Sequence, residues 1–261
     1  PYDGNLMAEN LQFVDWNLGE GVGRLTLRRP PLNILNIPML REMEHVVEEA
    51  RRDETLRVLI LAGKGKLFSA GVDVTDHTPD RVREMIPLFD RVCTALATFP
   101  APTLAAVHAA ALGGGCELAL SCDLVVASEE ASFGQPEIRL ASFAPVAAVR
   151  LPALVGYRKA AEMLFTGETI SAREAARMGL INLAVPPHEF EAGVEQLSKK
   201  LGSLSAAALR ICKKALRVTA DRWSSLADME TLYLEKLMST EDAQEGLAAF
   251  LQKRAPSWKH K

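Results

Sequence analysis

The chain has 261 residues, of which 48% are hydrophobic and 24% are charged. These values are typical of a globular protein and unlike those of a disordered or fibrous chain. The formal net charge is −3, and no cluster of lysine and arginine is interleaved with aromatic residues, which argues against a nucleic-acid-binding protein. No segment approaches the roughly 20 apolar residues that cross a bilayer, so we expect a cytoplasmic protein without a membrane partner.

The cysteines and histidines do not have the spacing of a metal site. No CxxC pair occurs, which argues against a zinc site or a redox pair. His108 and His188 have no partners at metal-ligand spacing, so we predict that no metal is bound. We expect buried, reduced thiols at all four cysteines: Cys93, Cys116, Cys122 and Cys212.

Strand and helix patterns alternate in the first half of the chain. Residues 11–16 and 22–28 predict a β-hairpin at a sheet edge. The glycine-rich residues 63–78 predict a long loop, and Pro79 predicts the first residue of a helix that ends before Pro100. Further elements follow from apolar spacing: a helix over 37–51, strands over 58–62, 103–107 and 124–127, and a short helix that begins in the run Gly113–Gly115. This alternation predicts an α/β fold with a parallel or mixed sheet covered by helices.

Beyond Val146 the chain is mostly helical in pattern. The expected helices cover 147–154, 159–165, 172–178, 190–201, 206–218 and 226–237, and 181–185 is the one strand expected among them. So many helices cannot all cover one sheet, so we expect an apolar face that closes against another subunit of a homo-oligomer. We predict two parts, a core over residues 7–200 and a C-terminal helical oligomerisation region over residues 201–261.

The three consecutive glycines mark a candidate oxyanion site. Gly113, Gly114 and Gly115 leave backbone N–H groups unshielded where a helix begins, and a helix N-terminus carries partial positive charge. The run lacks the Lys-Ser/Thr of a phosphate-binding loop and the spacing of a dinucleotide-binding GxGxxG, which disfavours nucleotide cofactors. The alternative is a site of close packing between helix and strand.

Two glutamates are candidates for acid/base chemistry. Glu117 lies about one helical turn after Gly114 among apolar neighbours, so we expect an enclosed carboxyl with a raised pKa. The alternative is an ordinary acid favoured by the helix dipole. Glu137 follows Pro136 in a segment without regular period, so we expect it on a loop, where a surface role is the alternative. Hydration of a double bond needs one group that takes a proton from water and another that gives one to carbon.

Three segments resemble the enoyl-CoA hydratase/isomerase family, the crotonase superfamily: LFSAGVDV (67–74), AALGGGCELALSCD (110–123) and SFGQPEI (132–138). FLQKRAPSW (250–258) is similar to the closing segment of that family. The resemblance implies a spiral of ββα units with a C-terminal helical region that forms a homotrimer or a dimer of trimers. It also implies an acyl-CoA substrate and no separate cofactor, because coenzyme A is part of the substrate.

The resemblance also assigns roles to individual residues. The backbone amides of Val72 and Gly114 correspond to the oxyanion hole for the thioester carbonyl, where each donor lowers the barrier by about 3 kcal/mol. Glu117 and Glu137 correspond to the catalytic acids, and the presence of both favours a hydratase over an isomerase. The sequence does not show which of them holds the proton at rest.

The resemblance also implies which residues contact coenzyme A and which line the acyl pocket. The backbone around Ala70, Asp73 and Val74 corresponds to the contacts with the adenine of coenzyme A, although Asp73 also fits a loop or helix-cap role. His77 is a candidate for the wall of the acyl pocket, with a plain loop histidine as the alternative.

Finer features resemble the hydratases of cyclic dienoyl-CoA esters in the breakdown of aromatic compounds: PPLNILNIPML (30–40), AGVDVTDHT (70–78) and FAPVAAVRLP (143–152). The implied reaction is a 1,4-addition of water that converts cyclohexa-1,5-diene-1-carbonyl-CoA into 6-hydroxycyclohex-1-ene-1-carbonyl-CoA. Straight-chain hydratases usually have a glycine-rich stretch where this chain has residues 141–145, which suggests a pocket reshaped by Phe143 and Pro145.

Three alternatives stay open at this point. One is a general straight-chain enoyl-CoA hydratase or isomerase of fatty-acid β-oxidation. Another is a non-catalytic protein of the same fold that binds coenzyme A or RNA, against which the glutamate pair and the weak basic charge both count. The third is a serine peptidase with Ser69 as nucleophile, which lacks a GxSxG motif or a convincing triad.

Overall fold

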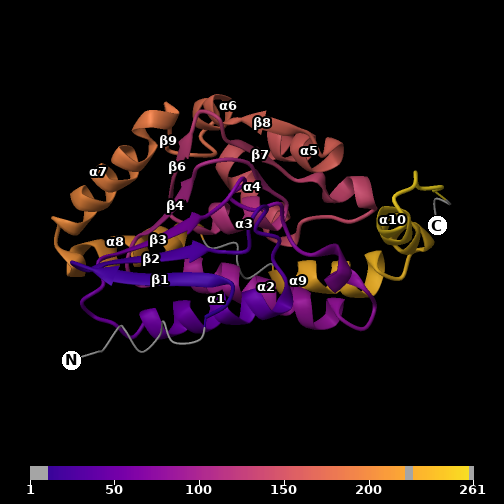
Figure 1. Ribbon diagram of the computed structural model, residues 1–261, viewed down its shortest axis with the longest axis horizontal. Coiled ribbons are helices and arrows are strands. Elements are labelled where there is room, and N and C mark those ends of the chain that lie inside the picture. The colour runs from indigo at the N-terminus through magenta and orange to yellow at the C-terminus, as the bar shows by residue number, and fades with distance from the viewer. Residues whose placement is uncertain (1–10, 221–225, 259–261) are drawn as a thin grey trace.

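The computed structural model describes residues 11–220 and 226–258 and has a six-stranded sheet at its centre (Figure 1). The strand order is β1-β2-β3-β4-β6-β9, with β1 and β2 antiparallel and the later pairs parallel. The strands are β1 (Val14–Gly19), β2 (Val22–Leu27), β3 (Val58–Gly63), β4 (Thr103–Val107), β6 (Leu124–Ser128) and β9 (Leu183–Val185). The predicted edge hairpin and the predicted parallel strands are confirmed.

Helices cover both faces of this sheet. The helices α1 (Ile37–Ala50) and α2 (Val82–Ala97) lie on one face, and α7 (Phe190–Gly202) packs on the other. Alternate residues of β3 therefore enter different clusters: Leu59 and Leu61 pack with α1 and α2, whereas Val58 and Ile60 pack with α7. Burial on both faces explains why this strand is an unbroken apolar run in the sequence.

A second, small sheet was not predicted. It consists of β5 (Ala111–Leu112), β7 (Ser132–Gly134) and β8 (Thr169–Ser171), of which β5 and β7 are parallel. The expectation that 181–185 is the one strand after Val146 was therefore wrong. Strands of two or three residues are too short to show an alternating pattern, so the sequence carries no signal for them.

The remaining helical segments differ from the expectations in several places, and the helices over 187–189 and 241–251 were not predicted. The helix α2 begins at Val82 because Thr78 and Pro79 lie in the preceding turn, the expected loop 63–78 contains the 3₁₀ helix η2, and Glu137 lies on the 3₁₀ helix η3 rather than on an irregular loop. The segments are η2 (Val74–His77), α3 (Gly114–Ser121), η3 (Pro136–Leu140), α4 (Pro145–Val155), α5 (Tyr157–Thr166), α6 (Ala172–Arg177), η4 (Pro187–Glu189), α8 (Ala206–Ala220), α9 (Leu226–Thr231), the π-helix η6 (Leu232–Leu237) and α10 (Glu241–Leu251).

The C-terminal helices return to the core of the same chain. Lys213 of α8 is 7% exposed; its Nζ pairs with Oδ2 of Asp123 at 2.6 Å and donates to the carbonyl of Ala101 at 3.1 Å. Burial of the Lys213 ammonium requires these partners, so the contact fixes how α8 docks. A division at residue 200 and a role of the tail in trimerisation stay predictions.

Two further observations concern the whole described part. None of its helices is both long enough and apolar enough to cross a membrane. Three of the four cysteines are buried free thiols, but Cys212 is exposed on α8, so the expectation of a buried thiol was wrong at that position.

Candidate active site

The segments 67–74 and 110–123 lie side by side, joined by backbone hydrogen bonds. The amide of Phe68 donates to the carbonyl of Ala110 at 3.1 Å, and the amide of Leu112 donates to the carbonyl of Ser69 at 3.0 Å. Gly71 follows with φ +99°, and a Cβ there would lie 3.0 Å from the carbonyl oxygen of Leu112 and 3.4 Å from the amide nitrogen of Gly114. Glycine is therefore needed where the two segments touch.

This contact brings two unpaired amides together. Leu35 and Val72 form an isolated parallel bridge, in which the amide of Leu35 donates to the carbonyl of Gly71 and the amide of Asp73 donates to the carbonyl of Leu35. The N–H of Val72 takes no part in this bridge and points away from Leu35. Gly114 is the first residue of α3, where no intrahelical acceptor exists. Within residues 11–220 and 226–258, neither amide donates a hydrogen bond.

The glycine run serves the close packing as well. A Cβ at Gly115 would lie 2.6 Å from both Cβ and the carbonyl oxygen of Ser69, so this position admits no side chain. Gly113 has φ +52°, and a side chain there would collide with Oε1 of Glu137. The run therefore packs tightly against its neighbours, and the amide of Gly114 at the start of α3 has no acceptor among the described residues.

Glu117 lies on α3 and is 3% exposed. Its Oε1 accepts a hydrogen bond from the amide of Ala147 at 2.9 Å, at the N-terminal end of α4. Burial raises the pKa of this carboxyl to about 7, against the opposing effect of the amides of Ala147 and Val146. The expectation of an enclosed acid is confirmed.

Glu137 reaches the same place from the small sheet. The strands β5 and β7 pair in parallel, so the segments that follow them, α3 and η3, start side by side, and the amide of Gly113 donates to Gly134 at 2.9 Å. Oε2 of Glu137 is buried and accepts no hydrogen bond from the described residues. Burial, with the charge of Glu117 as a second cause, raises the pKa of Glu137 to about 8.

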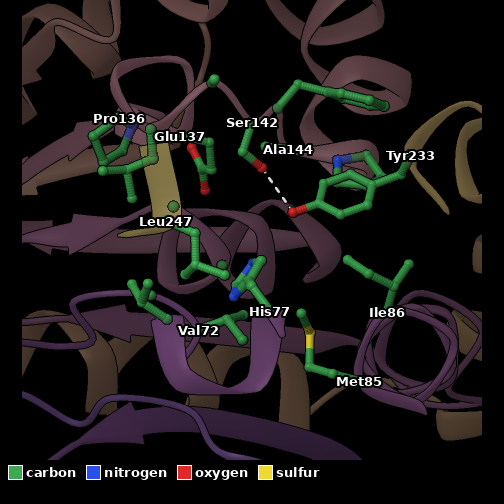
Figure 2. A pocket seen from close by; sticks show the side chains of 18 of the residues that line it. Val72, His77, Met85, Ile86, Pro136, Glu137, Ser142, Ala144, Tyr233 and Leu247 are labelled. Carbon is green, nitrogen blue, oxygen red and sulfur yellow. Dashed lines mark hydrogen bonds between the residues drawn. The ribbon is translucent and has the colours of Figure 1, made fainter. Parts of the chain in front are cut away.

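Glu117, Glu137, Val72 and Gly114 all line one cavity of about 320 Å³. Figure 2 shows Glu137 and Val72 in its wall. Ala70 and Val74 also line it, as do His77, Phe143 and Pro145, the three residues expected at an acyl pocket. Asp73 instead caps η2, because its Oδ1 accepts from the amide of Thr75 at 3.1 Å, and its Oδ2 pairs with Arg29 at 3.2 Å. The side chain of Asp73 therefore has the helix-cap role that was its alternative.

Part of the cavity wall was missed in the sequence. Tyr233 of η6 is 1% exposed, and its hydroxyl lies 2.7 Å from the hydroxyl of Ser142. Further residues of the C-terminal helices complete the wall: Met238, Ala243, Leu247 and Phe250. A buried tyrosine usually has a hydrogen-bond partner, but nothing in the sequence points from Tyr233 to a serine 91 positions earlier.

The comparisons with known proteins agree with this geometry. Residues 17–261 match the profile of the enoyl-CoA hydratase/isomerase family. The chain belongs to this family. Its α/β architecture is the crotonase fold that the motifs implied, and family membership makes it an enzyme of hydratase type.

Individual relatives cover almost the whole chain. A cyclohexa-1,5-dienecarbonyl-CoA hydratase of Thauera aromatica is 37% identical over 240 residues, which are 91% of this chain and 93% of the relative. A probable enoyl-CoA hydratase of Mycobacterium bovis is 35% identical over 92% of this chain and 95% of the relative. The crystal structure of an enoyl-CoA hydratase from Mycobacterium avium subsp. paratuberculosis superposes with a TM-score of 0.86 at 30% identity, covering 96% of this chain and 100% of that one.

Proposed function

We propose that this enzyme adds water to a conjugated enoyl- or dienoyl-CoA thioester. One observation carries the proposal: the carboxyl groups of Glu117 and Glu137 line the same cavity as Val72 and Gly114, whose amides are unpaired. Such amides suit a thioester oxygen that gains negative charge, and two acids with raised pKa suit proton transfer.

The steps follow from these groups. The thioester carbonyl oxygen accepts hydrogen bonds from the amides of Val72 and Gly114. Glu117, as carboxylate, takes a proton from water while the water oxygen forms a bond to the electron-poor carbon, and the π electrons move toward the thioester oxygen as an enolate. Glu137 then gives its proton to carbon, and the enolate electrons form the new C–H bond. The lower pKa of Glu117, about 7 against about 8, favours this division of roles.

The preferred substrate in this proposal is cyclohexa-1,5-diene-1-carbonyl-CoA, with 6-hydroxycyclohex-1-ene-1-carbonyl-CoA as product. The similarity to the Thauera aromatica hydratase supports it. So does the ring of Phe143 on the pocket wall, tilted against Tyr233 with centroids 5.4 Å apart. The competing proposal is a straight-chain enoyl-CoA substrate, which the similarity to probable enoyl-CoA hydratases favours.

An activity panel separates these substrates. Wild type is assayed with the cyclic dienoyl-CoA and with crotonyl-CoA, beside Glu117→Ala and Glu137→Ala. We expect the wild type to prefer the cyclic diene, and each variant to lose at least about a hundredfold in turnover while remaining folded. A strong preference for crotonyl-CoA would refute the cyclic substrate, and wild type that binds both esters but hydrates neither would refute the hydratase.

Two further assignments belong to the same proposal. We infer that the backbone at Ala70 and Val74 contacts coenzyme A, and their position on the cavity wall supports this. A trimer or a dimer of trimers is supported by large exposed apolar side chains on α5, where Tyr157 is 72% and Phe165 is 71% exposed. Light scattering coupled to gel filtration measures this assembly, and a monomeric mass at micromolar concentration would contradict it.

A further inference from the structure

The proposed acyl pocket contains a group of polar side chains that hydration does not use. Ser142 and Tyr233 form a hydroxyl pair at 2.7 Å, and the ring centroid of His77 lies 6.3 Å from that of Tyr233. All three residues line the cavity. Figure 2 shows the Tyr233 hydroxyl directed into the cavity, with Glu137 to one side and His77 below. Most of the wall around them is apolar, including Met85, Ile86, Phe89, Leu140 and Leu247.

The hydroxyl pair has a spare donor. Two hydroxyl groups carry two hydrogens, and the bond between Ser142 and Tyr233 uses one of them. The structure shows no second partner for either hydroxyl among the residues it describes. One O–H therefore has no acceptor within the described protein, at a place where an unpaired polar group is costly.

His77 supplies a spare acceptor. Its Nδ1 lies 3.1 Å from the carbonyl oxygen of Asp73, and a carbonyl can only accept, so Nδ1 carries the hydrogen of this bond. Burial lowers the pKa of His77, which favours the neutral ring. In the neutral ring with hydrogen on Nδ1, Nε2 has a lone pair and no hydrogen, and none of the described residues donates to it.

We propose that His77, Ser142 and Tyr233 form a subsite for a hydroxyl group carried by the acyl ring, so that hydroxylated cyclic acyl-CoA esters are a substrate class of this enzyme. A hydroxyl group is the substituent that matches both spare functions, because it donates to Nε2 of His77 and accepts from the hydroxyl pair. A carbonyl oxygen cannot donate to His77, and a methyl group satisfies neither function. The proposal rests on the proposed function in one respect, that the cavity holds the acyl group.

Binding of unreactive esters tests the subsite separately from hydration. Cyclohexanecarbonyl-CoA and its 3-hydroxy and 4-hydroxy derivatives have no ring double bond, so they cannot be hydrated, and calorimetry gives their dissociation constants. We expect one hydroxylated ester to bind wild type about tenfold more tightly than the unsubstituted ester, as two neutral hydrogen bonds allow. Equal affinity for all three esters would overturn the proposal, whether or not the enzyme hydrates dienes.

Variants identify the groups responsible. Tyr233→Phe and Ser142→Ala each remove a hydroxyl, and His77→Phe removes the acceptor but keeps a ring. We expect each to weaken binding of the hydroxylated ester severalfold and to leave the unsubstituted ester within about twofold. Ser203→Ala, which removes an exposed hydroxyl at the C-terminal end of α7, is the control and should alter neither. If Tyr233→Phe weakens both esters equally, the hydroxyl pair only ties the 141–144 segment to the C-terminal helices, and the subsite is refuted.

Discussion

A single methyl group at Gly114 should disable the proposed oxyanion hole. In Gly114→Ala the new Cβ would lie 2.7 Å from Cγ2 of Val72 and 3.2 Å from Cε2 and Cζ of Phe89. Contacts become ordinary only near 3.4 Å, so the difference from 2.7 Å requires a relative shift of about 0.7 Å between Gly114 and Val72. These are the two residues whose amides are proposed to bind the thioester oxygen, so the variant separates the two donors.

The expected magnitude follows from the geometry of catalysis. Misplacement of a reacting group by about 1 Å costs about a hundredfold in rate, and loss of one oxyanion donor costs about a hundredfold to a thousandfold. We therefore expect kcat of Gly114→Ala to fall about a hundredfold, equivalent to about 2.7 kcal/mol of barrier. Binding of the ground-state ester should change much less, because the amides act mainly on charge that develops in the transition state.

The assay is steady-state hydration of the cyclic dienoyl-CoA, followed by loss of its ultraviolet absorbance. Gly193→Ala, on α7 at the opposite face of the sheet, is the control, because its new Cβ would meet Val185 at an ordinary 3.7 Å. It should keep full activity and gain up to about 1 kcal/mol of stability from helix propensity. If correctly folded Gly114→Ala keeps kcat within about threefold of wild type, the amide of Gly114 does not bind the reacting oxygen.

Three further predictions concern ionisation and stability. The logarithm of kcat/KM should rise as Glu117 loses its proton near pH 7 and fall as Glu137 loses its proton near pH 8, and a flat profile from pH 6 to 9 would contradict the assignment. Asp90 is 2% exposed, and burial, with the charge of Glu117 as a second cause, raises its pKa to about 9. Between about pH 4 and about pH 9 the folded state therefore holds a proton that the unfolded chain has lost, so the free energy of unfolding falls as pH rises through this range. Asp90→Asn should stabilise the protein by on the order of 3 kcal/mol at pH 7 and very little at pH 4. Urea unfolding at the two pH values measures this difference. Asn33→Ala should cost about 3 kcal/mol in the same assay, because the buried Nδ2 of Asn33 donates to three carbonyls of the 64–68 loop, and an unchanged midpoint would show that these bonds do not hold the loop.

The sequence predicts the part of the cavity around Glu117 because its signals are local. The glycine run fixes where α3 begins, and three residues later the chain has an acid among apolar neighbours, so the burial of Glu117 follows from one turn of helix. The 3₁₀ helix that carries Glu137 was not predicted, because such short helices show no apolar repeat. The convergence of the two acids depends on the pairing of β5 with β7. Strands of two or three residues are too short for the sequence to show that they pair.

The opposite wall of the cavity could not be predicted for a different reason. Tyr233 meets Ser142 only because the C-terminal helices return over the core, and a contact between residues so distant in sequence has no periodicity or spacing to reveal it. Asp90 was missed because α2 shows a clear apolar stripe, and a single acid within such a stripe gives no indication of its burial.

The most direct test of the proposed acid/base pair is single-turnover hydration of the cyclic dienoyl-CoA by Glu117→Gln and Glu137→Gln. Ester affinity is measured on the same preparations. Each variant keeps the shape of the side chain and removes its ability to exchange a proton. We predict a rate constant at least about a hundredfold below wild type for both, with ester affinity within about threefold. A rate within about threefold of wild type for either variant would contradict the claim that Glu117 takes a proton from water and Glu137 gives one to carbon in the same hydration.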